Sequence, residues 1–404
     1  MKNILGLILL ALLALPGCGD GPNACNEGNF CEVNESGNAA CIDGYEWLNA
    51  SADDDFRCKE KTYLPVLGDG KNTTTAVQLT VVGTSADGLN VPRDLEFHPN
   101  VPGQLWVVNR GDESIVIYSD MGQATQSDQK KKAGFAEAGQ HFLAQPAAIS
   151  FGANGNFSTI HETDQLTQGA ATPEDFMGPT MWTSDLAFFN AGHSGHLDMM
   201  HNTPLGMGIA WETGNVYWVF DGYHSSITRY DFVDDHGLGG SDHSDGIVSR
   251  YVQGNVKRSA DIVSHMEIDH ATGLLYIADT GNNRIAVLDT KTGTKGSNLT
   301  DLNYDCSEYI CPDYHYVDGV NFSELISGTD QGMSKPSGLA LHGDHVYVSD
   351  FATGMIYGFT KEGKLLDWLD TGRPNALSGM DFDSDGSLYV TDKVANEILR
   401  IQAL

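Results

Sequence analysis

The residues with the clearest capacity for chemistry are histidines that recur at short intervals. His193, His196 and His201 have the spacing H-x2-H-x4-H, and we expect His161 and His265 near the same mouth of the fold argued below. Imidazole is a ligand that suits zinc, copper or nickel. These five side chains therefore either hold zinc or another transition metal, or are solvated and hydrogen-bonded histidines with no metal.

A second group centres on Tyr223, in the segment FDGYH. A tyrosine can act as a general base when a metal ion or a cation such as Arg110 lowers its pKa. Arg110, His224 and Asp221 are then candidates for ligand contact. The structural alternative is that Asp-Gly-Tyr closes a strand as a turn. Aspartates recur at that position of the repeats, which favours a turn-capping role for them: Asp221, Asp279, Asp350 and Asp392.

Two acidic segments could bind cations. The segment DFDSDG places Asp381, Asp383 and Asp385 in the D-x-D-x-D-G pattern of calcium loops, although position 12 of that pattern is Asp392 and not glutamate. A plain β-turn between two strands fits the same residues. The segment 234–246, DDHGLGGSDHSDG, also has cation ligands, but it is typical of a solvated loop.

These residues lie on a repeated unit, clearest at 264–289 and 337–360. Each copy has three segments of alternating apolar residues, separated by Gly- or Asp-containing turns, and weaker copies occupy 92–119, 204–231 and 378–401. Alternation of period 2, repeated at this interval, predicts the blades of an all-β propeller. Six units are expected, with first strands that begin near Asp94, Ala147, Gly206, His265, Gly338 and Gly379.

The last unit stops after three strands because the sequence ends at Leu404. The segment 73–83, TTTAVQLTVVG, alternates as a strand and has no other partner. We therefore expect this N-terminal strand to complete the sixth blade, which removes an exposed edge. The propeller is predicted over residues 73–404.

The order of strands within a blade sorts the connecting segments by face. Segments 162–180 and 191–204 should crowd the channel mouth, together with Arg110, Tyr223 and the histidines named above. Segments 232–247 and 290–318 should lie on the opposite face.

The N-terminus indicates where the protein is located. One lysine precedes an apolar run from Ile4 to Leu15, too short to span a bilayer as a mature helix and typical of a signal peptide over residues 1–17. The following Leu15-Pro16-Gly17-Cys18 resembles the bacterial lipoprotein processing box, which implies acylation of Cys18 and an outer-membrane or cell-surface address through a lipid anchor. Ordinary cleavage near Gly17 is the alternative.

Six cysteines remain after Cys18, an even number that favours disulfides in an exported chain: Cys25, Cys31, Cys41, Cys58, Cys306 and Cys311. The first four lie in a stretch of little apolar periodicity, and CIDGYEW resembles part of an epidermal growth factor-like module. We expect residues 18–62 to form a small disulfide-linked stalk, and the spacing does not decide which cysteines pair. No CxxCH or zinc-ribbon spacing is present.

The charge balance limits the class of partner. The chain has 54 acidic and 23 basic residues, for a formal net charge of −31. Nucleic acid is excluded as an expected partner, because its binding depends on cationic contacts to phosphate.

The repeats resemble NHL repeats, which implies a six-bladed propeller but no particular chemistry. Three segments are also similar to the peptidyl-hydroxyglycine α-amidating lyases, which hold zinc and calcium in the channel. That resemblance implies a substrate-binding Arg110 in NRGD, a catalytic Tyr223 in FDGYH and a zinc-binding His265 in VSHMEID. The two other zinc histidines of that family fall on Ala147 and Ser378, and its second arginine falls on Thr280.

Two functions follow. The one that we expect is a surface-tethered propeller that binds a peptide, glycan or protein at its mouth, with or without a metal. The alternative is a metal-dependent lyase or hydrolase of the amidating-lyase type, disfavoured because one family histidine cannot hold a catalytic zinc.

Overall fold

The computed structural model describes residues 31–33, 39–41, 45–47, 58–60, 62–132, 141–164, 176–189, 196–300 and 313–404. The chain forms two compact units, Met1–Thr62 and Tyr63–Leu404. Several predicted features lie outside the described residues: the signal segment 1–17, Cys18, Cys25, Cys306, Cys311 and His193. Among the described residues, no helix is long and apolar enough to cross a membrane.

In the first unit, two short strand pairs are described. β1 (Cys31–Val33) pairs with β2 (Ala39–Cys41), and β3 (Tyr45–Trp47) pairs with β4 (Cys58–Glu60). A disulfide joins Cys41 to Cys58 with an S–S distance of 2.02 Å, so one of the expected cross-links is formed.

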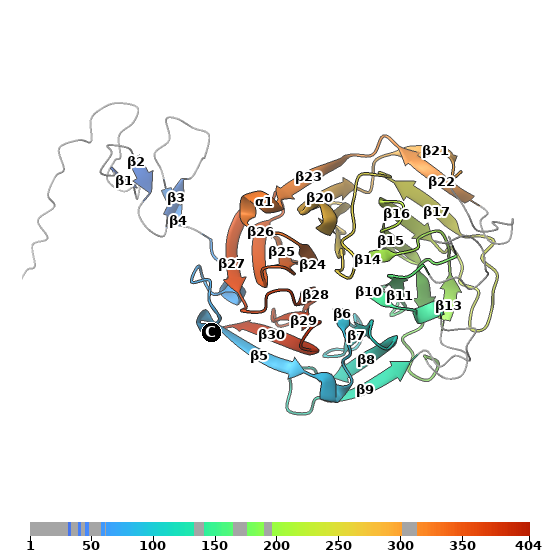
Figure 1. The fold of residues 1–404 in the computed structure, drawn as a ribbon, viewed down its shortest axis with the longest axis horizontal. Helices are drawn as coiled ribbons and strands as arrows, with labels where there is room; N and C mark the ends of the chain where they lie inside the picture. The colour runs from blue at the N-terminus through green and yellow to red at the C-terminus, as the bar shows by residue number, and fades with distance from the viewer. Residues whose placement is uncertain are drawn as a thin grey trace, which may run out of the picture. The chain divides into compact units, whose positions relative to one another are not determined.

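The second unit is a six-bladed β-propeller, as predicted from the repeats (Figure 1). Blade 1 is built from β6 (Pro92–Phe97), β7 (Leu105–Asn109), β8 (Ser114–Ser119) and β9 (Ser127–Lys132). Blade 2 contains β10 (Pro146–Phe151), β11 (Phe157–His161), β12 (Thr180–Trp182) and β13 (His196–Met199). Blade 3 contains β14 (Gly206–Thr213), β15 (Val216–Asp221), β16 (Ser226–Asp231) and β17 (Ile247–Tyr251).

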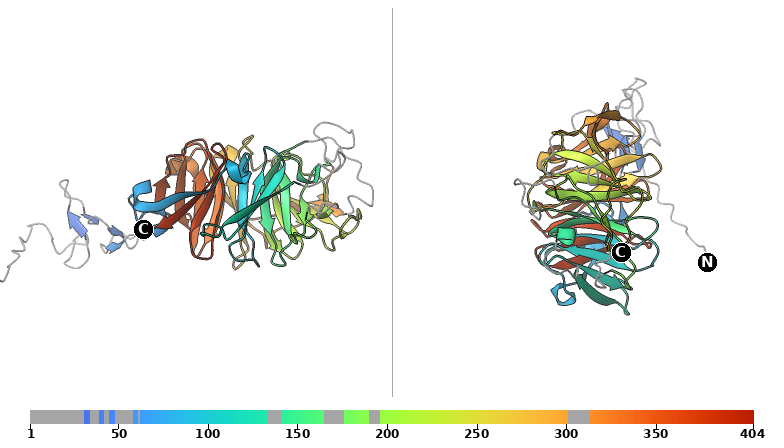
Figure 2. Two further views of the ribbon diagram at one scale, coloured as in Figure 1. Left: turned by 90° about the horizontal axis from the view of Figure 1, so that it is seen from below. Right: turned by 90° about the vertical axis from the view of Figure 1, so that its right-hand side faces the viewer.

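The remaining blades complete the ring. Blade 4 contains β18 (Met266–Asp269), β19 (Leu274–Asp279), β20 (Arg284–Asp289) and β23 (Phe322–Ser327). Blade 5 contains β24 (Pro336–His342), β25 (His345–Asp350), β26 (Met355–Thr360) and β27 (Leu365–Asp370). Blade 6 contains β28 (Leu377–Phe382), β29 (Leu388–Asp392), β30 (Glu397–Ala403) and β5 (Val77–Gly83). Seen from the edge of the ring, the strands run between its two faces (Figure 2).

The predicted closure of the ring is confirmed. β5 pairs antiparallel with β30, with Leu79 opposite Ile401 and Val81 opposite Leu399. The compact unit begins before residue 73, because the 3-10 helix η1 (Pro65–Leu67) also packs on this part of the ring. Leu67 is fully buried in the same apolar cluster as Leu399 and Ile401.

Neighbouring blades are held together by apolar side chains. In the cluster between blades 3 and 4, Trp218 and Phe220 of β15 pack with Met266 of blade 4 and Leu275 of β19. Each fully buried side chain of this size contributes about 1.5 to 3 kcal/mol by leaving water. This explains why β15, VYWVFD, is apolar without alternation: neighbouring blades cover both of its faces.

The innermost strands approach one another so closely that glycine is required. A Cβ atom on Gly338 would lie 2.1 Å from the carbonyl oxygen of Ser378 in the next blade, and one on Gly208 would lie 1.9 Å from that of Ser264. The glycines at the start of the repeats therefore mark the narrow part of the ring.

Blade 3 differs from the prediction for segment 290–318. Its described parts form β21 (Thr294–Asn298) and β22 (Asp313–Asp318), and β22 pairs in parallel with β17 (Figure 1). The sheet thus has six strands, and what was expected to be a loop on the opposite face extends the outer edge of blade 3. The added strands satisfy the hydrogen-bonding groups that β17 would otherwise expose.

Candidate functional site

One end of the ring gathers the segments predicted to form its mouth. Because the strands of each blade are antiparallel, the links between second and third strands share this end with the links that enter first strands. Arg110 follows β7, Glu162 follows β11 and Lys393 follows β29, whereas Arg258 and Asp261 precede β18. Contacts among these five side chains, from four blades, define the mouth.

Glu162 is the centre of the mouth. Its side chain is only 4 % exposed, and it faces three guanidinium groups. The distances from its carboxylate oxygens are 3.1 Å to Arg93 Nη2, 3.1 Å to Arg258 Nη1 and 3.5 Å to Arg110 Nε. The backbone N–H of Asp261 also donates to Glu162, at 2.7 Å. Glu162 therefore joins three arginine side chains into one ion-pair cluster.

Asp261 lies on the outer side of the same cluster. Its Oδ1 is 3.3 Å from Arg110 Nη1 and 3.4 Å from Arg93 Nη1, and its Oδ2 is 3.9 Å from Lys393 Nζ. Burial, and after it the charge of Arg93, lowers the pKa of Lys393 to about 8. The mouth therefore gathers cationic side chains of a strongly acidic chain and pairs them with carboxylates.

A pocket of about 430 Å³ opens beside this cluster. Arg110, Arg258, Glu162 and Asp261 line it, together with Gln145, Thr163, Asp164, Leu205 and Ala260. An adjoining hollow of about 420 Å³ shares Arg110 and Gln145. Arg110 is thus the charged side chain common to both cavities.

Arg110 has an N–H donor on its guanidinium that makes no hydrogen bond within the described part of the chain. Its side chain is 28 % exposed, and its nearest charged partners lie at 3.3 and 3.5 Å. Its Nε is buried and has no hydrogen-bond partner among the residues that the structure describes. A guanidinium in this state can accept a planar anion in two-point contact. The prediction of a ligand-binding role for Arg110 is consistent with this place.

Tyr223 lies on a turn that borders the pocket. A Cβ atom on the preceding Gly222 would lie 2.5 Å from Arg258 Cδ and 2.2 Å from the carbonyl oxygen of Leu205. Tyr223 itself is 41 % exposed, and its ring contacts that of His224 at 4.7 Å between centroids. No described contact joins Tyr223 to Arg110 or His265, the two residues with which it was expected to converge.

Asp221 and His224 form a buried network behind this turn. Asp221 is fully buried, and its carboxylate accepts the backbone N–H groups of Tyr223 and His224 and lies 2.7 Å from His224 Nδ1. The guanidinium of Arg250, also buried, lies 4.0 Å away. These contacts show the turn-capping role considered for Asp221, and they leave the carboxylate shielded from the pocket.

His265 lies inside the ring, where both of its nitrogens are used. Its Nδ1 accepts the backbone N–H of Leu339 at 3.1 Å, and its Nε2 is 3.3 Å from Asp94 Oδ2. The metal set predicted around this residue is not assembled in the described part of the chain, because His161, His196 and His201 have other neighbours. Backbone and carboxylate partners satisfy His265 instead.

His161 and His201 are buried and bonded to main-chain carbonyls. His161 Nδ1 is 3.2 Å from the carbonyl oxygen of Gly178, and His201 Nδ1 is hydrogen-bonded to that of Phe176. Burial lowers the pKa of each to about 4, so both are neutral at physiological pH.

His196 was expected in a mouth loop but is the first residue of strand β13. Its ring is 4.7 Å from that of His236, which was assigned to a loop on the opposite face. Close by, Asp198, His236 and His243 have ligand atoms within 4.8 Å of one another. In the described residues these three are the one group of histidine, cysteine and acidic side chains that could hold a metal ion.

The acidic segment at 381–386 forms a turn, the alternative considered beside calcium. Asp383 Oδ1 accepts the backbone N–H groups of Asp385 and Ser387, whereas Asp381 Oδ2 accepts that of Phe97 in blade 1. Because Asp381 bridges two blades and Asp383 holds the turn, the three carboxylates do not form a metal group.

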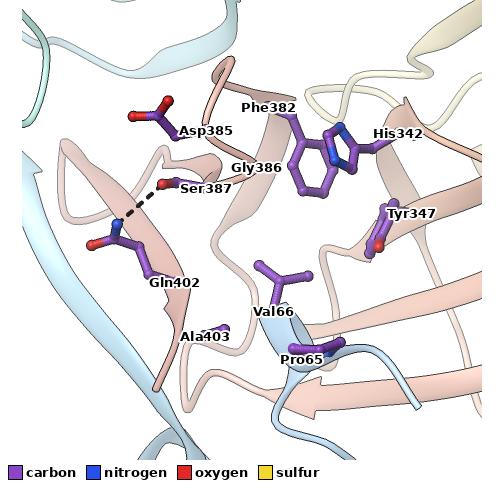
Figure 3. Close-up of a pocket in the computed structure, with 10 residues that line it drawn as sticks. All are labelled: Pro65, Val66, His342, Tyr347, Phe382, Asp385, Gly386, Ser387, Gln402 and Ala403. Carbon is purple, nitrogen blue, oxygen red and sulfur yellow. Dashed lines mark hydrogen bonds between the residues drawn. The ribbon is translucent and has the colours of Figure 1, made fainter.

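A third pocket, of about 350 Å³, lies where η1 meets blades 5 and 6 (Figure 3). The ring of His342 stacks on that of Phe382 at 4.4 Å, and Tyr347 meets Phe382 edge-on at 4.7 Å. Gln402 donates to Ser387 at 3.2 Å on the other wall. None of the predicted ligand or metal histidines lines this pocket.

The sequence prediction placed the segment that begins with Glu162 at the mouth, but it did not single out five side chains of the cluster: Arg93, Glu162, Arg258, Asp261 and Lys393. A signal for them was present in the chain, because only 23 residues are basic. A basic residue in a link at the same end of the ring as Arg110 is therefore a candidate for the mouth. Arg258 and Lys393 lie in such links.

No protein-family model matches the chain, and no curated protein matches it in sequence. Among solved structures, it is similar to an auxiliary nutrient binding protein from Bacteroides thetaiotaomicron, with 10 % identity, a TM-score of 0.53 and coverage of 89 % of this chain and 83 % of that one. It is also similar to a luciferin-regenerating enzyme (13 % identity, TM-score 0.49, covering 81 % and 96 %). A third similar structure is that of a virginiamycin B lyase from Staphylococcus aureus, solved with quinupristin. Its sequence identity is 13 % and its TM-score is 0.46, with coverage of 80 % of this chain and 85 % of that one. At such identities the likeness concerns the propeller fold alone.

Proposed function

We propose that the protein is a ligand-binding propeller whose mouth recognises a small molecule or peptide end with a carboxylate or phosphate group. The observation that carries this proposal is Arg110, partly exposed between two cavities, with its Nε lacking a hydrogen-bond partner among the described residues. Leu205 and Ala260 offer apolar contact beside it. A pocket with a few convergent polar groups on a rigid ring is the usual form of such a site.

The support for an anionic ligand comes from the guanidinium donors, which share the pocket wall with three carboxylates. Arg93, Arg110, Arg258 and Lys393 meet the carboxylates of Glu162 and Asp261, and Asp164 is a third acid in the pocket wall. An anion placed beside Arg110 would gain two-point hydrogen bonds to a guanidinium whose present partners lie at 3.3 and 3.5 Å.

Binding is favoured over the lyase alternative by the surroundings of His265. Both ring nitrogens of His265 have partners within the ring, and the family's other zinc positions are Ala147 and Ser378. Tyr223 has no contact with either His265 or Arg110 among the described residues.

We also propose that the protein is exported and anchored at a bacterial outer membrane or cell surface through acylated Cys18. This rests on the apolar segment from Ile4 to Leu15 and the Leu-Pro-Gly-Cys sequence that follows it. The cysteine-rich segment then serves as a spacer between anchor and propeller.

The test is calorimetry with a panel of organic acids, sugar phosphates and peptides with free carboxyl termini. At least one member should bind, and Arg110→Ala should weaken its binding by about 1.5 to 3 kcal/mol, the usual contribution of a hydrogen bond to a charged group. Arg229→Ala, which removes an arginine paired with Glu212 on blade 3, is the control. Equal affinity in the wild type and Arg110→Ala would exclude this mouth as the binding site.

A further inference from the structure

We propose a second site, for a divalent transition-metal ion, held by Asp198, His236 and His243 at the outer boundary between blades 2 and 3. Asp198 belongs to β13, the outermost strand of blade 2, and both histidines lie in the link from β16 to β17 of blade 3. That link is at the end of the blade opposite to the mouth. The site is therefore separate from the pocket beside Arg110, and its test is independent of the proposed ligand.

The three side chains are close enough to share one ion. Their ligand atoms lie within 4.8 Å of one another, and the rings of His236 and His243 are 5.2 Å apart between centroids. A tetrahedral ion with bonds of about 2.0 to 2.2 Å separates its ligands by about 3.3 Å, so rotation of the side chains suffices to close the set. Imidazole with carboxylate suits zinc and its first-row neighbours.

The hydrogen bonds of His236 already set the tautomer that a metal requires. Its Nδ1 lies 2.6 Å from the carbonyl oxygen of Gly237, which can only accept, so Nδ1 carries the proton. Its Nε2 is then unprotonated and offers a lone pair to a metal ion. This atom is buried and has no hydrogen-bond partner in the described part of the chain. Metal-binding histidines characteristically donate their second nitrogen to a carbonyl or carboxylate in this way.

His243 has the matching arrangement with a carboxylate. Its Nδ1 is 2.6 Å from Asp198 Oδ1, and the Asp198 side chain is only 2 % exposed. This pair satisfies Nδ1 of His243 and one oxygen of Asp198, but it does not provide a partner for His236 Nε2. A bound cation would satisfy all three groups at once.

A fourth candidate ligand stands next to this set. His196 precedes Asp198 by two residues on β13, with a register shift of the β12–β13 pairing between them, so it is the contact with His236 that places it near the set. The ring of His196 is buried and lies 4.7 Å from that of His236. The sequence signal for the site is therefore H-x-D on the strand and H-x6-H in the link.

The surrounding charges favour a cation. The link that carries both histidines also has four exposed aspartates, whereas the histidines themselves are half-buried: Asp234, Asp235, Asp242 and Asp245. Exposed carboxylates around a sheltered group raise the local concentration of cations. A metal at this place would tie the link of blade 3 to the outer strand of blade 2.

The experiment uses full-length protein without an affinity tag, stripped with a chelator and titrated with Zn²⁺ against a chromogenic competitor. Cobalt absorption in the visible range reports the ligands of the same site. We expect one ion per chain. His236→Ala and His243→Ala should each weaken binding by more than about tenfold. His270→Ala, on the turn of blade 4 beside Trp211, should bind as the wild type does.

Two further measurements, the folding of the variants and the number of ions bound per chain, are needed to interpret the titration. Both alanine variants change half-buried link residues, and circular dichroism of the stripped proteins verifies that they fold. If either fails to fold, His236→Gln keeps a side chain of similar size and takes its place. The proposal is overturned if stripped wild type takes up no stoichiometric ion, or if its affinity survives in both histidine variants, which would indicate adventitious binding by the exposed aspartates.

Discussion

Nε2 of His265 lies 3.3 Å from Oδ2 of Asp94, so a side chain of blade 4 meets one of blade 1 from the opposite side of the ring. Both residues are buried, and the same carboxylate also accepts backbone N–H groups of Leu95 and Ile149 at 2.9 and 3.0 Å. The centre of the propeller is thus filled by partnered polar groups at this level.

The first prediction concerns Asp94. Its two oxygens receive three donors, so the amide of Asp94→Asn would direct an N–H group at one of them. We expect a loss of about 2 to 4 kcal/mol in the free energy of unfolding, measured with urea. Asp289→Asn, at an exposed turn where the carboxylate accepts one backbone N–H, is the control and should cost less than about 1 kcal/mol. Similar losses in the two variants would contradict a structural role for the contact.

The narrowness of the ring gives a second prediction. Gly338→Ala places a Cβ atom 2.1 Å from the carbonyl oxygen of Ser378, so one inner strand must shift. We expect a cost of about 1 to 3 kcal/mol from overpacking, seen as a lower midpoint of thermal unfolding. Gly319→Ala is the control. Its added Cβ atom would have no other atom within 4 Å, so this variant measures the cost of the positive φ alone. A smaller effect at Gly338 than at Gly319 would disprove the close approach.

Lys393 gives the third prediction, which depends on the proposed function. Its pKa of about 8 lies below the ordinary 10.5, so it loses its charge as the pH rises through 8. Glu162, Asp261, Arg93 and Arg110 face the same cluster. Because a bound anion favours the protonated lysine, its affinity should fall as the pH rises above 8. Lys393→Met should bind more weakly at neutral pH and lose this dependence. A pH profile unchanged by the substitution would count against the site.

Glu267 of blade 4 supplies a fourth prediction. Burial, reinforced by the charges of Asp381 and Asp94, raises its pKa to about 8 from an ordinary value of 4.5. The folded state therefore binds more protons than the unfolded state between these values, and Glu267 favours folding at low pH and loses that contribution as the pH rises through 8. Glu267→Gln should flatten the decline in stability between pH 5 and 8. Glu324→Gln, on the exposed strand β23, should leave it as it is.

The fifth prediction tests the anchor. In a bacterial host, the wild type should incorporate labelled palmitate and fractionate with membranes, because acyl chains at Cys18 would hold it there. Cys18→Ala should lose the label and the membrane association. Cys25→Ala, which changes a cysteine of the proposed spacer, should retain both. A labelled Cys18→Ala protein would show that acylation occurs elsewhere.

The fold could be predicted because its determinants are local. Alternation in 73–83 was enough to indicate the strand that closes blade 6, and the glycines at 206, 338 and 379 marked the starts of inner strands. The repeats also sorted most links by face. The sequence also contains a signal for the extension of blade 3, because DYHYVD (Asp313–Asp318) has polar and apolar residues in near alternation, as in a strand.

The sites were harder to predict because they depend on which links meet. Arg110 was identified from its own segment, but Glu162 and Asp261 gain their role only from three-dimensional contact with it. The histidines were paired wrongly for the same reason: His196 opens a strand of blade 2 and meets His236 of blade 3. Spacing along the chain gives no measure of such distances between blades.

The pairing of β5 with β30 has a consequence for biosynthesis. During synthesis from the N-terminus, β5 precedes every other strand of the propeller, yet its hydrogen-bonding partner is β30 (Glu397–Ala403), which follows all of them. β5 therefore has no described pairing partner until β30 has been synthesised, after the other strands of the propeller. Deletion of β30 would therefore remove the strand with which β5 pairs in the described structure and leave blade 6 open.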